Sequence, residues 1–326
     1  MSCSLEIGGY FELERFSGHH YHENAIALNC GRGCLAYLIE LRAIKSVWVP
    51  DWICDSVPEV FIREGVAVKR YAVGEDFLPT YDFEIGAEDW LLLVDYYGQL
   101  DQADIDKALG NCGGRLIVDE TQGFFRSPWI GCDTVYSTRK WFGVSDGGYL
   151  ATSDGKRLER TLPTDESHDR MSFVLGRFER SAGEFYGEAS ENNHVFRDEP
   201  AKEMSPITTN LLRAVDYDAV SRRRSGNWEV LSSALTGINK LSLKTPDAPF
   251  MYPLMIDDAL RVREKLINEK VFVPVLWPDV LNKADSTSWA YRFASEILPL
   301  PIDQRYGEQE MDRMLTLLEG AGVFRG

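Results

Sequence analysis

Short apolar runs alternate with amphipathic segments along residues 25–152, and this alternation is the clearest structural signal in the sequence. The runs predict strands at residues 25–29, 47–50, 67–71, 91–96, 116–119, 134–137 and 148–152. Apolar residues at helical spacing predict helices at residues 33–43 and 56–64. Such alternation is typical of a mostly parallel sheet covered by helices on both faces. We therefore expect a three-layer α/β fold that binds its ligand at the carboxyl ends of the strands.

The second half of the sequence has a different organisation. Residues 154–203 are polar and lack a clear period, which predicts an irregular surface excursion or a subunit contact. The elements predicted after it are a helix at 207–235, a strand at 249–256, a helix at 259–268, a strand at 272–274 and a helix at 307–318. A boundary near Gly226 would separate a large domain of residues 1–225 from a small C-terminal α/β domain of residues 226–326.

Composition and charge exclude several classes of protein. Apolar residues make up 44% of the chain and charged residues 26%, which is typical of a soluble globular protein. A formal net charge of −16 disfavours binding to nucleic-acid phosphates. No apolar run is long enough to span a bilayer, and the N-terminal residues do not resemble a signal peptide. The six cysteines lack the paired spacing of a zinc site, so we expect reduced thiols, no metal and a cytoplasmic location.

The first predicted strand leads into a glycine-rich turn, Cys30-Gly31-Arg32-Gly33, that opens a helix. Such a turn can direct backbone N–H groups and the positive end of the helix dipole at an anion. The pattern also fits the G-x-G-x-x-A fingerprint of a dinucleotide-binding fold, with Asp51 at the spacing of the ribose-binding acid. A third interpretation is that the glycines only turn the chain. The turn by itself does not decide among the three.

A second candidate site follows the strand at residues 116–119. Asp119 ends this apolar run at its carboxyl edge, and Gln122 follows three residues later. A cofactor with a pyridinium nitrogen requires a carboxylate at such a position, because the charge pair keeps the nitrogen protonated. Gln122 would be placed to hydrogen-bond a phenolic oxygen of the same ring. The simpler alternative is an acid that caps a turn at the end of a strand.

The third candidate is Lys140, which follows the strand at residues 134–137 and precedes Trp141. An amine that attacks a carbonyl must be neutral, and burial among aromatic side chains favours the neutral form. Ser137 can donate a hydrogen bond to a phosphate, and Gly147-Gly148 permits a sharp turn nearby. Lys140 can also be read as a surface lysine. The serine–lysine pair of penicillin-binding proteins is a further alternative, disfavoured because its companion motifs are missing.

In this order along the chain, the candidate segments resemble the DegT/DnrJ/EryC1/StrS family of fold-type I enzymes that use pyridoxal 5'-phosphate (PLP). Most members of that family are sugar aminotransferases. Residues 30–35 are similar to its S-G-T-S-A-L turn, and the Asp119–Gln122 stretch to its E-D-A-A-Q segment. The remaining similar segments are residues 94–99, 137–148 and 298–310. The resemblance covers most of the chain, which is a short member of the group.

The resemblance implies a PLP-dependent aminotransferase in which Lys140 forms the Schiff base with the cofactor. Asp119 would keep the pyridinium protonated. An amino-acid donor, in this family often glutamate, would deliver the amino group to a keto-sugar acceptor, most plausibly nucleotide-linked and used in polysaccharide biosynthesis. Family members act as homodimers with active sites at the subunit interface, so the resemblance also implies a homodimer.

The same resemblance assigns residues to the cofactor. Backbone N–H groups of Arg32 and Gly33, together with Ser137, would hold the phosphate. Gln122 would contact the ring oxygen. Cys54 falls where the family usually has an aromatic residue stacked on the ring, so the stacking residue is expected to be Trp52 or Tyr97 instead.

The family segment by which the partner subunit reaches the phosphate has no clear counterpart in this sequence. The residues considered as replacements are Asn192, Asn193 and Arg197. Two other functions stay open. One is an NAD-dependent Rossmann oxidoreductase built on Gly31 and Gly33, and the other is a catalytically idle PLP-fold protein with a binding or regulatory role. A PLP-dependent sugar dehydratase is disfavoured, because those relatives replace the lysine with histidine.

Two smaller clusters have simple interpretations. His19-His20-Tyr21-His22 is predicted to be an exposed polar loop rather than a metal site, because no acid or cysteine stands at a supporting spacing. Arg222-Arg223-Arg224 is predicted to be the solvated face of a helix rather than a clamp for a substrate phosphate.

Overall fold

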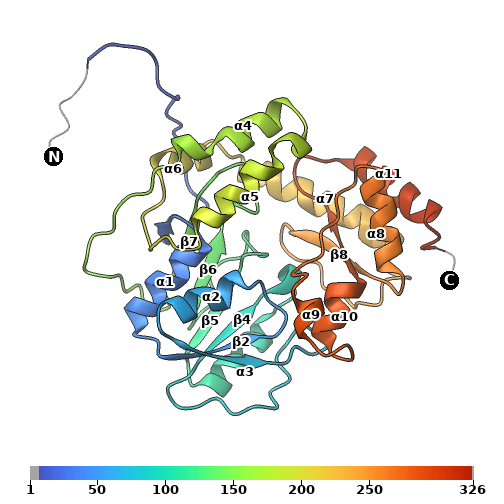
Figure 1. Cartoon of the computed structure of the whole chain (residues 1–326), viewed down its shortest axis with the longest axis horizontal. Helices are drawn as coiled ribbons and strands as arrows, with labels where there is room; N and C mark the ends of the chain where they lie inside the picture. Colours follow the sequence, from blue (N-terminus) through green and yellow to red (C-terminus); the bar gives the residue numbers. More distant parts are fainter. Residues whose placement is uncertain (1–6, 325–326) are drawn as a thin grey trace.

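The computed structural model describes residues 7–324, and its centre is a seven-stranded sheet with the order β1-β7-β6-β5-β4-β2-β3 (Figure 1). The strands are β1 (Ile26–Leu28), β2 (Ser46–Pro50), β3 (Ala67–Tyr71), β4 (Trp90–Val94), β5 (Leu116–Asp119), β6 (Asp133–Ser137) and β7 (Gly148–Ala151). Neighbouring strands from β3 to β6 run parallel, and β7 is antiparallel to both of its neighbours. The predicted mostly parallel sheet is confirmed.

The central strands are almost wholly buried because both faces of the sheet are covered. Every residue of β5 and β6 is buried, and so are four of the five residues of β4. Parallel β4, β5 and β6 all end at the same edge of the sheet. The residues that follow β5 and β6 therefore lie side by side, although they are far apart in the sequence.

Helices α1 (Gly31–Arg42) and α2 (Ser56–Arg63) pack against each other, and α3 (Gln102–Cys112) packs on β4 and β5. Helix α3 has well-formed ends, with a capping box between Asp101 and Asp104 and a left-handed Gly113 after its last turn. Helix α3 was not predicted from the sequence.

Residues 154–203 are more ordered than expected. They contain the short 3-10 helices η2 (His168–Arg170) and η3 (Ala182–Phe185) and the α-helices α4 (Ser172–Glu179) and α5 (Tyr186–Val195). The single helix predicted at 207–235 is two helices, α6 (Pro206–Leu212) and α7 (Tyr217–Leu235). Asp216 stands between them and accepts a hydrogen bond from the N–H of Ala219, so it begins a new helix.

The C-terminal part adds a two-stranded antiparallel sheet of β8 (Met251–Met255) and β9 (Ile297–Pro301). Its helices are α8 (Ala259–Asn268), α9 (Val280–Lys283), α10 (Trp289–Glu296) and α11 (Glu308–Gly320). The strand predicted at 272–274 is wrong: these residues form no strand, and β9 is the partner of β8.

Helix α7 passes without a break through Gly226, the predicted domain boundary. Its later residues, beginning with Trp228, belong to a second hydrophobic cluster built from the C-terminal elements. In Figure 1, α7 joins the region of the large sheet to the group formed by β8, α8 and α11. The division into domains of residues 1–225 and 226–326 stays a prediction. Within residues 7–324, no helix is both long and apolar enough to cross a membrane.

Candidate functional site

Three chain segments meet at the carboxyl edge of the sheet. Gly148, the first residue of β7, pairs with Leu28 on one side and with Ser137 on the other. The turn after β1 and the end of β6 therefore lie at the same edge of the sheet, with only β7 between the two strands. Asp119 ends the next strand, β5, and Lys140 follows three residues after β6. The fold thus brings the predicted site residues Asp119, Ser137 and Lys140 to one edge together with the start of α1.

Asp119 is a buried carboxylate without an ionic partner. It is 8% exposed, and its Oδ1 accepts the N–H of Thr121 at 2.9 Å. Burial raises the pKa of Asp119, while the bonds from Thr121 and the charge of Lys140 act in the opposite direction. No cation lies within ion-pair distance among the described residues. The site therefore has a buried carboxyl group that forms no ion pair in residues 7–324 but lies within electrostatic reach of Lys140.

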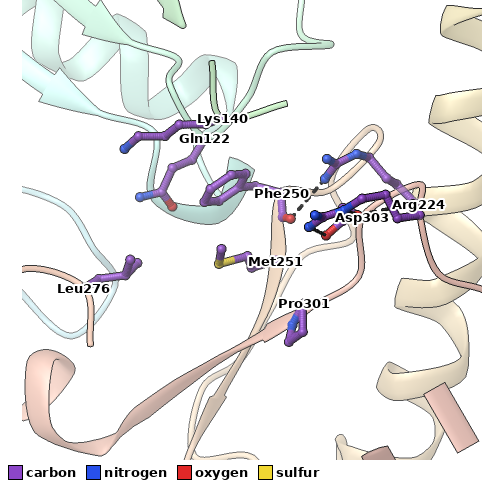
Figure 2. A pocket seen from close by; sticks show the side chains of 9 residues that line it. Gln122, Lys140, Arg224, Phe250, Met251, Leu276, Pro301 and Asp303 are labelled. Atoms are coloured by element: carbon purple, nitrogen blue, oxygen red, sulfur yellow. Dashed lines mark hydrogen bonds and ion pairs between the residues drawn. The ribbon is translucent and has the colours of Figure 1, made fainter. Parts of the chain in front are cut away.

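Lys140 is exposed in this chain, which corrects the expectation that neighbouring aromatic residues bury it. Trp141 turns the opposite way and packs into a hydrophobic cluster with Phe124 and Phe250. The lysine side chain instead lines two cavities, of about 320 and 720 Å³. The smaller cavity is shown in Figure 2.

Gln122 is 3% exposed and lines the smaller cavity with Lys140 (Figure 2). Its Oε1 accepts the N–H of Tyr97 at 2.9 Å, which fixes the orientation of the amide. Within residues 7–324 its Nε2 makes no hydrogen bond, so this N–H₂ group is available to an oxygen in the cavity.

The turn at the start of α1 is capped by a thiol. Cys30 Sγ accepts the N–H of Gly33 at 3.3 Å, and the N–H of Arg32 is also directed at it. The N–H groups of Arg32 and Gly33 were expected to be free for a phosphate, but in this structure both are directed at the thiol. Sulfur is a weak acceptor, so an anion oxygen can compete with it. A side chain at position 33 would place its Cβ 2.1 Å from Asn29 Oδ1, which explains the glycine.

Arg139 lies beside the same turn and was not predicted from the sequence as a site residue. Its guanidinium hydrogen-bonds the side-chain oxygen of Asn193 and lies 4.5 Å from the ring centre of Phe196. Its Nε is buried without a partner, and neither Arg139 nor Arg32 forms an ion pair within the described chain. Burial lowers the pKa of Arg139 to about 10. Two unpaired guanidinium groups at a helix N-terminus form a site suited to an anion.

Asn193 comes from helix α5 of the same chain. Its backbone oxygen accepts a hydrogen bond from Arg32 at 2.9 Å, and its side chain contacts Arg139. It is one of the three residues considered as replacements for the partner-subunit segment. Ser137 is also close: it is 8% exposed, and its Oγ makes no hydrogen bond in the described part of the chain.

Trp52 does not line this site. It has no exposed surface and packs among aromatic rings, with Tyr96 at 4.6 Å and Phe293 at 4.8 Å between ring centres. Tyr97 is also fully buried. In this arrangement neither residue offers a free face to a cofactor ring. Both rings are part of the hydrophobic core, and the spacing of residues in the sequence does not show which aromatic side chains are buried.

The dinucleotide interpretation does not fit the sheet order. A dinucleotide fold needs the acid on the strand next to the one that leads into the glycine turn. Here β1 pairs only with β7, and four strands separate β1 from β2. Asp51, after β2, instead accepts the N–H of Val73 at 3.1 Å.

Two interpretations of smaller clusters need correction. His22 is 7% exposed and stacks on Tyr136 at 3.9 Å, so it belongs to the packed interior rather than to an exposed loop. Arg222 and Arg223 are exposed as expected, but Arg224 is 1% exposed and lines the cavity with Lys140. No group of three or more possible metal ligands is found within residues 7–324.

No protein-family model matches the chain, and no curated protein matches its sequence. Solved structures do match. The sugar aminotransferase CalS13 from Micromonospora echinospora is 16% identical, with a TM-score of 0.64 over 91% of this chain and 87% of that one. A DegT DnrJ EryC1 StrS aminotransferase from Brucella abortus is 16% identical, with a TM-score of 0.63 over 91% and 85%. The chain has the fold of these aminotransferases. The expected fold class is thereby confirmed.

A third similar structure is NtdA from Bacillus subtilis, solved with the bound cofactor PMP, the amine form of PLP. It is 13% identical, with a TM-score of 0.62 over 94% of this chain and 78% of that one.

The residues of this chain fit PLP by charge. The cofactor carries a ring nitrogen that can be cationic, an aldehyde and a phosphate. The chain has an unpaired buried carboxylate, Asp119, an accessible amine, Lys140, and the unpaired cations Arg32 and Arg139. The carboxyl group suits the ring nitrogen, the amine suits the aldehyde and the two guanidinium groups suit the phosphate. The residues present therefore fit PLP.

Proposed function

We propose that this protein is a PLP-dependent aminotransferase of the DegT/DnrJ/EryC1/StrS type. One observation supports this above the others: Lys140 lies at the same edge of the sheet as the buried carboxyl group of Asp119 and the guanidinium groups of Arg32 and Arg139, none of which forms an ion pair in residues 7–324. These opposite charges are costly to leave unmatched. A single ligand with a cationic ring nitrogen and a phosphate neutralises both.

Each residue then has a defined task. Lys140 would hold the cofactor through its aldehyde, and its amine would move a proton as general base and acid. Asp119 would keep the ring nitrogen protonated, and Gln122 would donate to the ring oxygen. Arg32, Arg139 and Ser137 would hold the phosphate, with the N–H groups of the α1 turn. When bound, PLP supplies an electron sink for the carbon that bears the reacting nitrogen.

The substrates we propose are an amino-acid donor, for which glutamate is the first choice, and a keto-sugar acceptor that is nucleotide-linked. The acceptor class is supported by similar folds that are described as sugar aminotransferases. We also propose a homodimer. Helices α4 and α5 carry the exposed apolar residues Leu175, Phe178 and Tyr186, which are suited to a subunit contact.

The test is cofactor attachment. Purified protein supplied with PLP should turn yellow, with an absorption band at about 410–430 nm. Borohydride reduction, proteolysis and mass spectrometry should then find the cofactor fixed on the peptide that contains Lys140. Addition of glutamate should bleach the band, and a keto-sugar should restore it.

Two variants sharpen this test. Lys140→Ala should abolish trapping, whereas Lys156→Ala, which removes a surface lysine, should leave it unchanged. Trapping at another lysine would refute the assignment of Lys140. A protein that takes up no PLP would refute the proposed function, and trapping without bleaching by any amino donor would indicate an idle PLP-fold protein.

A further inference from the structure

The smaller cavity has two chemically different ends. Figure 2 shows Lys140 and Gln122 on one side and Arg224 with Asp303 on the other. Phe250 lies between them, so the middle of the cavity is apolar. Its volume of about 320 Å³ is at the lower end for ligand pockets, which span roughly 300–1,000 Å³. A ligand that fits this cavity is small. It has a group that can react at the Lys140 end, apolar atoms in the middle and a polar group at the Arg224 end.

Arg224 is held rigidly at the polar end. Its Nη1 donates to the backbone oxygens of Pro249 and Phe250, both at 3.1 Å, and its Nε donates to Gln304 Oε1 at 2.8 Å. The guanidinium lies 4.3 Å from the ring centre of Trp141, the residue after Lys140. Its Nη2 makes no hydrogen bond within residues 7–324, so these donors remain for a ligand.

The charge of Arg224 has no direct counterpart. No carboxylate of the described chain lies within 4.0 Å of it, and the nearby acid, Asp303, is engaged by Arg305 through two bonds of 2.6 and 2.9 Å. Burial lowers the pKa of Arg224 to about 10, so it is still cationic at neutral pH. A buried cation of this kind is stabilised by an anion that enters the cavity.

We propose that Arg224 is a specificity-determining residue that binds the distal carboxylate of an acidic amino-acid donor. This inference rests on the proposed function, because it places the donor amine at the Lys140 end. The methylene groups of the donor then lie against Phe250 and Met251. Arg305 supports this role indirectly. It forms an ion pair with Asp303, so that this carboxylate does not pair with Arg224.

The test compares three donors that differ only at the distal group: L-glutamate, its neutral amide L-glutamine, and L-norvaline. With the PLP-loaded protein, the rate and apparent affinity of cofactor bleaching are measured for each. The wild-type protein should prefer glutamate over both others by about 10- to 100-fold, the range of a hydrogen-bonded charge pair. Arg224→Met should reduce the reaction with glutamate by about 10- to 100-fold more than the reactions with glutamine and norvaline, so that the preference for glutamate is lost.

The control is Arg222→Met, which removes an exposed arginine two residues earlier in the same helix. It should behave as wild type. Arg224→Lys, which keeps the charge, should retain part of the preference. An equal loss for all three donors would overturn the inference in favour of a structural role, and so would a wild-type protein without preference for glutamate. In both cases the PLP spectrum persists, whereas failure of the proposed function abolishes the spectrum itself.

Discussion

Gly148 lies in a narrow part of the candidate site, between the α1 turn and the end of β6. An alanine there would place its Cβ 2.8 Å from the carbonyl carbon of Cys30 and 3.0 Å from both the oxygen of Cys30 and the nitrogen of Gly31. Ordinary contact begins at 3.4 Å, and all three atoms belong to the backbone, so no flexible side chain can yield. Overpacking of this kind costs about 1–3 kcal/mol.

We therefore expect Gly148→Ala to lower the free energy of unfolding by about 1–3 kcal/mol and to weaken PLP binding, because the clash displaces the turn proposed to hold the phosphate. Urea denaturation and a PLP titration followed by absorbance measure the two effects. Gly110→Ala is the matched control: this exposed glycine of α3 has no atom within 4 Å of the added Cβ, and the change should stabilise the helix slightly. A Gly148→Ala protein with wild-type stability and PLP affinity would refute the packing argument.

Three further variants test other parts of the structure. Asp119→Asn should reduce transamination by about 10²-fold, since the neutral amide cannot hold a protonated ring nitrogen; steady-state kinetics measure this. Arg139→Gln should raise the PLP dissociation constant about 10- to 100-fold in an equilibrium titration. The pKa of His22 is 6.5 in the unfolded chain, and burial lowers it to about 4 in the folded protein. As the pH falls, the unfolded chain therefore takes up a proton at His22 before the folded protein does. Stability should drop by about 3 kcal/mol between these pH values, and His22→Phe should remove that drop in denaturation curves.

The sequence predicted the large sheet well because its central strands β4 and β5 are short apolar runs. Buried parallel strands need apolar residues on both faces, and this makes them visible without knowledge of the fold. The helices of residues 154–203 were not predicted, because α4 and α5 expose much of their surface and have no strong apolar face. The strand β9 was missed since its apolar run, Ile297–Pro301, contains prolines that disfavour strands.

For the candidate site, residues at strand ends could be predicted and residues fixed by packing could not. Strand position predicts that Asp119, Ser137 and Lys140 lie at one edge of the sheet, and the order of the motifs made them candidates. Arg139 was overlooked because an arginine next to Lys140 looks like an ordinary surface residue, and only its unpaired buried Nε distinguishes it. Trp52 was assigned to the cofactor because an exposed and a core aromatic have the same appearance in a sequence.

Helix α7 carries Arg224 and, one turn later, Trp228 of the second hydrophobic cluster. A continuous helix of this length moves as a unit, so repacking of that cluster shifts the guanidinium relative to Lys140. Changes at Leu231 or Leu235, which never meet a substrate, would then alter the choice of amino donor. Laboratory evolution of donor range in this protein should therefore recover substitutions in its C-terminal core as well as in the cavity wall.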